Sequence, residues 1–173
     1  MPKDAGSQIY VGTYAKYNEG CIAGQWLDLA TYSTKDLFFE KCRELHKDEC
    51  DPELMFQNWE GIPKGLIGES FVKDELWDWL ELDDHEKELL EVYQEYIDDS
   101  CDIDRARDAF MGKGYRDEAD WAVEWLEETG GLDGVPQHLI NYIDYEAYAR
   151  DARLAGDVCF VRHDGDLWVF SNH

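Results

Sequence analysis

Residues 74–104 constrain the fold most strongly, because this stretch carries fourteen Asp and Glu residues and a single Lys. Like charges at such density repel one another and oppose a compact state. Exposed helices usually mix both signs, since a Glu four residues before a Lys stabilises a helix by about 0.2–0.5 kcal/mol. The segment can fold only if its carboxylates face solvent while its apolar side chains pack together.

The apolar side chains of this segment recur at helical spacing. The pattern predicts one helix over about 73–81, with Leu76, Trp77 and Leu80 facing inward. Asp83 is a suitable N-cap for a second helix, because its carboxylate can accept from backbone N–H groups of the first turn. The buried stripe of that second helix is expected to consist of Leu89, Val92, Tyr93, Tyr96 and Ile97.

Carboxylates occupy the opposite side of the same predicted helix. Positions at i, i+4, i+7, i+11 and i+14 share one face, and here they hold Asp84, Glu88, Glu91, Glu95 and Asp98. Residues 117–130 repeat the design, ending at Gly130, with an apolar stripe of Ala119, Ala122, Trp125 and Leu126 opposite Asp117, Asp120, Glu124, Glu127 and Glu128. Trp121 and Trp125 are expected to lie in the core and at its rim.

The remaining sequence predicts two small units of mixed helix and strand. Residues 9–14 and 21–29 indicate strands joined by a turn at 16–20, and 54–60 a third strand. Between them, Ser33 is expected to cap a helix over 34–46, with one face formed by Leu37, Phe38, Cys42 and Leu45. Residues 61–70 should form a loop.

The C-terminal part has its own helix and strand signals. They predict a helix after Asp102, a short strand at 110–115 and a helix that Pro136 begins. Residues 159–170 indicate a hairpin closed by Asp164 and Gly165.

The net charge of −24 argues against binding to DNA, RNA or an anionic membrane surface, and favours a cationic partner. Seven Trp, ten Tyr and seven Phe distinguish the chain from acidic disordered segments, so it should fold. The polar start MPKDAGSQ has no apolar signal core, and five Cys without a CxxC indicate reduced thiols. We therefore expect a cytoplasmic protein.

Three chemical alternatives are weaker. Carboxylates can perform acid–base hydrolysis, but no pair stands out among forty. A calcium loop starting at Asp98 would need Gly where Ile103 stands. Cys42, His46 and Cys50 fall one turn apart and could touch zinc, but no fourth ligand is evident. We expect neither an enzyme nor a cofactor or metal.

Charge density suggests a different function. If residues 74–104 were one straight helix, its fourteen carboxylates would be spaced at roughly 3.3 Å along the axis. One strand of B-DNA carries a phosphate roughly every 3.4 Å. Such a surface could compete for a groove that binds DNA. The alternative is an acidic regulatory or salt-adapted module without DNA-like geometry.

Three blocks of the sequence resemble the ArdA antirestriction proteins, namely IYVGTYAKYNEGCIAGQWLDL, DPELMFQNWEGIPKGLIGES and EETGGLDGVPQHLINYIDYEAYARD. Their order and spacing fit the family too. The resemblance implies a DNA mimic, carried by plasmids and conjugative transposons, that occupies the DNA-binding groove of Type I restriction-modification enzymes. It also implies three small domains in a curved row, dimerised through the last.

The sequence and the resemblance together predict a homodimeric α+β protein with two small antiparallel sheets flanking a helical middle. The expected domains are 1–71, an acidic 72–104 and a dimerising 105–173. The carboxylates expected to replace phosphates are Glu81, Asp84, Glu88, Glu91, Glu95, Asp98, Asp99, Asp102, Asp104, Asp117, Asp120, Glu124, Glu127 and Glu128.

Overall fold

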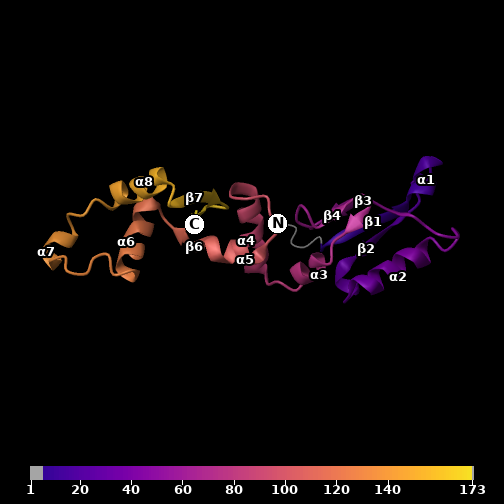
Figure 1. Ribbon diagram of the computed structural model, residues 1–173, viewed down its shortest axis with the longest axis horizontal. Helices are drawn as coiled ribbons and strands as arrows, with labels where there is room; N and C mark the ends of the chain where they lie inside the picture. The colour runs from indigo at the N-terminus through magenta and orange to yellow at the C-terminus, as the bar shows by residue number, and fades with distance from the viewer. Residues whose placement is uncertain (1–5, 173) are drawn as a thin grey trace. The chain divides into compact units, whose positions relative to one another are not determined.

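The computed structural model describes residues 6–172 and combines helices with strands, which confirms the predicted α+β class. Its chain forms two compact units (Figure 1). The first unit runs to Gln94 and includes Asp98–Cys101, and the second holds Glu95–Ile97 and the chain from Asp102 onward. A division into three domains at 72 and 104 stays a prediction.

The first unit is built on a three-stranded antiparallel sheet in the order β2-β1-β3. Its strands are β1 (Gln8–Thr13), β2 (Gln25–Asp28) and β3 (Leu54–Glu60), as the alternating pattern predicts. The expected turn after β1 is instead a short helix, α1 (Tyr14–Asn18), because the Thr13 side chain accepts from the Lys16 N–H and starts a helical turn.

Helix α2 (Lys35–Leu45) follows a 3₁₀ turn at Leu29–Thr31 and supplies the core of this unit. Thr34 caps it, its hydroxyl accepting from the Leu37 N–H at 3.3 Å, so the prediction of Ser33 as the cap is wrong by one residue. Phe38 and Cys42 are fully buried, whereas Leu37 is 45% exposed and does not belong to the predicted face.

The predicted loop at 61–70 contains part of a two-stranded ribbon, β4 (Ile67–Gly68) and β5 (Phe71–Val72), which is a third small sheet. Helix α3 (Glu75–Leu80) follows and buries Leu76 in the core of the first unit. Trp77, Trp79 and Leu80 pack against the same core. The predicted helix at 73–81 is therefore confirmed.

Helix α4 (Asp84–Tyr96) begins as predicted, because the Asp83 carboxylate accepts from the Glu86 N–H at 2.8 Å. Leu89, Leu90, Val92 and Tyr93 are buried along it. Tyr96 is 45% exposed, so the buried stripe ends before the predicted position.

The second unit contains the sheet β6-β8-β7, all antiparallel. Its strands are β6 (Phe110–Tyr115), β7 (Val158–His163) and β8 (Asp166–Ser171), and its helices are α5 (Ile103–Ala109), α6 (Glu118–Glu128), α7 (Gln137–Ile140) and α8 (Tyr145–Ala155). The predicted hairpin is confirmed, with Asp164 (φ 49°) and Gly165 (φ 85°) at its turn.

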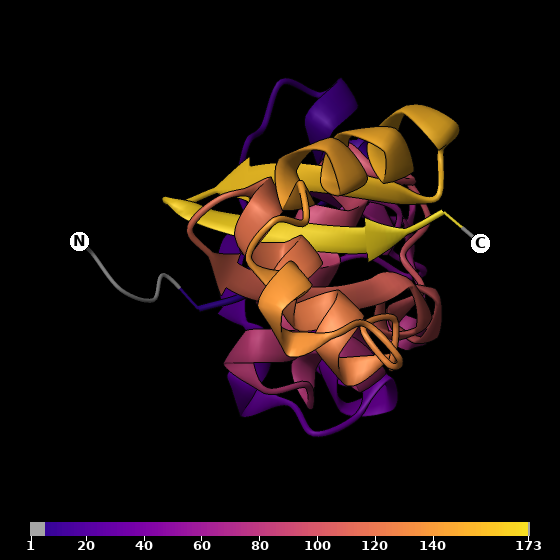
Figure 2. The ribbon, with the colours of Figure 1, turned by 90° about the vertical axis from the view of Figure 1, so that its left-hand side faces the viewer.

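Residues after Pro136 form two helices rather than one. Asp144 interrupts the helical pattern, because its carboxylate accepts from the Ala147 N–H at 2.9 Å and caps α8. Figure 2 faces this unit and shows α8 beside the β7–β8 hairpin.

The core of the second unit centres on Trp121, which packs with Ala122, Ala149, Val158 and Val169. Its ring stacks on the half-buried Trp125 at 6.0 Å, so the expectation of one core and one rim tryptophan is confirmed.

Candidate interaction surface

The α4 row comprises Asp84, Glu88, Glu91, Glu95 and Asp98. The first four lie on α4 and are exposed apart from Glu88, which is half-buried. Asp98 lies two residues beyond the end of the helix, where its carboxylate accepts from the N–H and hydroxyl of Ser100 at 3.3 and 3.2 Å. The row is thus mainly a solvated helix face whose last member belongs to a turn.

The α6 row comprises Asp117, Asp120, Glu124, Glu127 and Glu128. Glu124, Glu127 and Glu128 are exposed on the last turns of α6. Desolvation raises the pKa of Glu124, and the charges of Glu128, Asp120 and Glu127 and a side-chain hydrogen bond with Glu128 raise it further. These carboxylates are close enough to resist one another's ionisation.

The negative charges of the α6 row also affect Tyr115 on β6. Burial raises the pKa of its hydroxyl first, and the negative charges of Glu124, Glu128 and Asp120 raise it further. The field of the α6 row therefore extends over the neighbouring end of β6.

Other members of the predicted set also hold helix ends. Asp117 caps α6, its carboxylate accepting from the Asp120 N–H at 2.8 Å. Asp120 is half-buried and accepts from the Arg116 N–H at 3.1 Å. Asp102 caps α5 by accepting from the N–H groups of Asp104 and Arg105 at 3.0 and 3.3 Å. Periodicity missed these roles, although an Asp directly before a helix is a recognisable capping signal.

The remaining members of the predicted set lie near helix ends. Glu81 follows α3, and Asp99 lies between α4 and α5; both are exposed. Asp104 is exposed too, and its carboxylate lies 3.0 Å from an Arg107 guanidinium nitrogen. An ion pair this exposed is weak, so Asp104 can exchange Arg107 for another cation.

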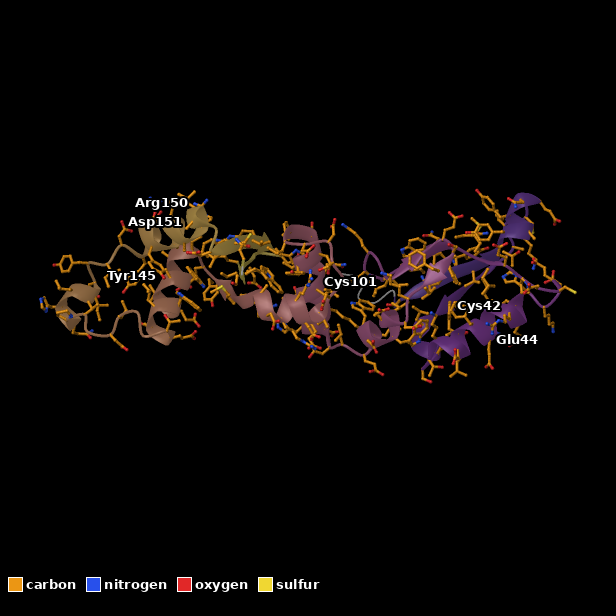
Figure 3. All side chains as sticks on the ribbon, viewed as in Figure 1. Cys42, Glu44, Cys101, Tyr145, Arg150 and Asp151 are labelled. Atoms are coloured by element: carbon orange, nitrogen blue, oxygen red, sulfur yellow. The ribbon has the colours of Figure 1, made fainter. Side chains whose placement is uncertain are left out.

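Several basic side chains are held locally instead of spreading over the acidic faces. Arg150 and Asp151 approach within 3.8 Å on α8 (Figure 3). Arg153 lies 3.4 Å from Glu118, and Arg162 donates to the Arg116 carbonyl at 2.7 Å. Lys87 lies over the ring of Trp79 at 4.8 Å. Each of these four basic side chains thus has a neighbouring group as a partner.

Cys42, His46 and Cys50, the possible zinc ligands, do not form a common site. Burial raises the pKa of Cys42 to about 12, and its thiol packs in the core of the first unit. His46 is buried, with Nδ1 2.9 Å from the Lys16 ammonium and Nε2 3.2 Å from the Val11 carbonyl oxygen, so both ring nitrogens are engaged. Cys50 is exposed. The calcium alternative fails as well, because Ile103 begins α5 instead of continuing a loop.

No helix within residues 6–172 is long and apolar enough to cross a membrane.

A family model described as "Antirestriction protein (ArdA)" covers residues 9–165. The chain matches none of the curated proteins with which it was compared. The matched range includes every carboxylate of the α4 row and the α6 row.

Proposed function

Because this chain belongs to the ArdA family of antirestriction proteins, we propose that it inhibits Type I restriction-modification enzymes by occupying their DNA-binding groove. Its exposed carboxylates take the positions of DNA phosphates against Lys and Arg of the groove. The observation that carries the proposal is the exposed group of Glu124, Glu127 and Glu128 on the last turns of α6, within the range that the family model matches.

The physical basis is competition between two polyanions. DNA binding draws much of its free energy from neutralising phosphates with Lys and Arg, which releases counterions. A protein of net charge −24 can draw on the same cations. Such binding is spread over many weak contacts, so no single carboxylate is essential.

The carboxylates contribute in two ways. Glu91, Glu95, Glu124, Glu127 and Glu128 are exposed side chains whose main contribution is charge. Asp102, Asp117 and Asp120 also satisfy backbone N–H groups, so their loss would weaken both the fold and the binding. A test of mimicry should therefore begin with the first group.

We further propose a homodimer formed through the second unit. Leu139, Tyr142 and Leu154 are 45%, 85% and 71% exposed there. Burying such side chains against a second copy would remove apolar surface from water. A monomer mass in light scattering at all accessible concentrations would contradict this assembly.

The test of function is an inhibition assay with a purified Type I enzyme and its DNA substrate. We expect both proteins to be cytoplasmic, so they would meet in the cell. Competitive inhibition should lose potency as DNA is added and as salt rises. Inhibition that was indifferent to both DNA concentration and ionic strength would contradict the proposal. DNA alone, without enzyme, should not bind the protein.

A further inference from the structure

Lys87 is the single Lys or Arg among the fourteen carboxylates of residues 74–104. It lies on α4, three residues after Asp84 and four before Glu91. Residues at these spacings are neighbours on a helix surface, where opposite charges attract. An unrestrained Lys87 side chain would thus be placed to pair with the α4 row.

The structure holds the ammonium elsewhere. Its Nζ atom lies 4.8 Å from the centre of the Trp79 ring and donates to the Leu80 carbonyl at 3.3 Å. Both partners belong to the end of α3. Within residues 6–172, Lys87 forms no ion pair with a carboxylate.

These partners suit a cation without using an acidic side chain. The face of an indole ring attracts cations more strongly than that of Phe or Tyr. Carbonyl groups at the C-terminal end of a helix carry partial negative charge and lack partners within the helix. Together they satisfy the ammonium, so Lys87 does not neutralise Asp84 or Glu91.

We propose that Trp79 is a positioning residue: with the Leu80 carbonyl, it holds Lys87 away from Asp84 and Glu91, so that Lys87 does not compete with the target for these two carboxylates. This inference rests on the proposed function. It assigns to Trp79 an effect on inhibition that depends on Lys87.

The experiment is a double-mutant cycle between Trp79→Leu and Lys87→Met, measured as inhibition of a Type I enzyme at low salt. In the parent, Trp79→Leu should release Lys87 toward Glu91 and weaken inhibition about two- to five-fold, the range of an exposed ion pair. In the Lys87→Met background the same change should have no effect, because no cation is released. Lys87→Met alone should inhibit like the parent.

Controls separate charge from packing. Trp77→Leu removes another half-buried indole of α3, whose N–H donates to the Tyr32 carbonyl at 3.2 Å. Its effect should be equal in both Lys87 backgrounds. If Trp79→Leu unfolds the protein, Trp79→Phe keeps a ring with weaker attraction for the cation and should give a smaller effect of the same kind.

The outcomes are distinct. Trp79→Leu could weaken inhibition equally in the parent and in the Lys87→Met background. That result would mean that Trp79 acts only through packing, and it would overturn the inference. So would an unchanged potency in a folded Trp79 variant, provided that Glu91→Gln with Glu95→Gln still weakens inhibition. If that acidic pair also had no effect, the α4 row would not contact the target and the inference would fail with it, whereas neutralising the α6 row would still test the proposed function.

Discussion

Neutralising three carboxylates of the α6 row should weaken inhibition strongly while leaving the fold intact. The change is Glu124→Gln with Glu127→Gln and Glu128→Gln, which keeps side-chain size and helix propensity. All three side chains are exposed, and no backbone cap depends on them. Their removal also relieves the repulsion that contributes to the raised pKa of Glu124.

The expected magnitude follows from counting contacts. If each carboxylate contributes about 0.3–1 kcal/mol, as exposed ion pairs do, three contribute about 1–3 kcal/mol. That corresponds to an inhibition constant raised about 5- to 150-fold. The slope of log affinity against log salt should fall by about 3, since three groups that resemble phosphates are lost.

The assay compares this variant with a matched control. Asp36, Glu40 and Glu44 are exposed acids at one-turn spacing on α2, outside both rows, and their amide variants change the net charge equally. The α6 variant should lose far more potency than the control, at an unchanged or higher melting temperature. Equal losses would mean that only total charge matters, and a folded α6 variant of undiminished potency would refute the row as a contact surface.

Three further outcomes are expected. Asp117→Ala should lower the stability of the second unit by about 0.5–2 kcal/mol in denaturant unfolding, because α6 loses its cap, whereas Glu127→Ala should leave it nearly unchanged. Alkylation at pH 8 should modify the exposed Cys50 and spare Cys42, whose pKa is about 12; rapid modification of Cys42 in folded protein would contradict its burial. The pKa of Glu124 is raised in the folded state, so the folded protein loses stability as pH rises from the ordinary pKa of Glu to the raised one. The melting temperature should therefore decline over that interval, and Glu124→Gln should make the decline smaller.

Sequence patterns were most informative where chemistry is local. Ile9 and Val11 alternate with outward residues and predict β1, and Asp164 with Gly165 predicts the β7–β8 turn. The patterns failed where one polar side chain overrides a longer periodicity. Thr13 starts a helix in an expected turn, and Asp144 splits an expected helix into α7 and α8.

Sequence patterns also predicted some features of the candidate surface and missed others. Helical spacing places Glu91 and Glu124 on solvated faces, where the structure has them. Spacing alone could not show that Glu88 is half-buried, since that depends on tertiary packing. Nor could it show the path of Lys87 back to Trp79, because the turn between α3 and α4 brings these side chains together.

Gln94 is a neutral side chain that Glu could not replace without cost, even in this acidic protein. It is buried on α4, and its amide donates to the backbone carbonyls of Lys64 and Asp99 at 3.1 and 3.4 Å. Hydrolysis of that amide would add only one negative charge to the −24 of the chain. It would nevertheless place a carboxylate against two carbonyl oxygens in a site shielded from water, which is strongly unfavourable. A Glu at position 94 would have to take up a proton or lose both contacts, so the effect of a new charge on this protein depends on where it appears far more than on the total.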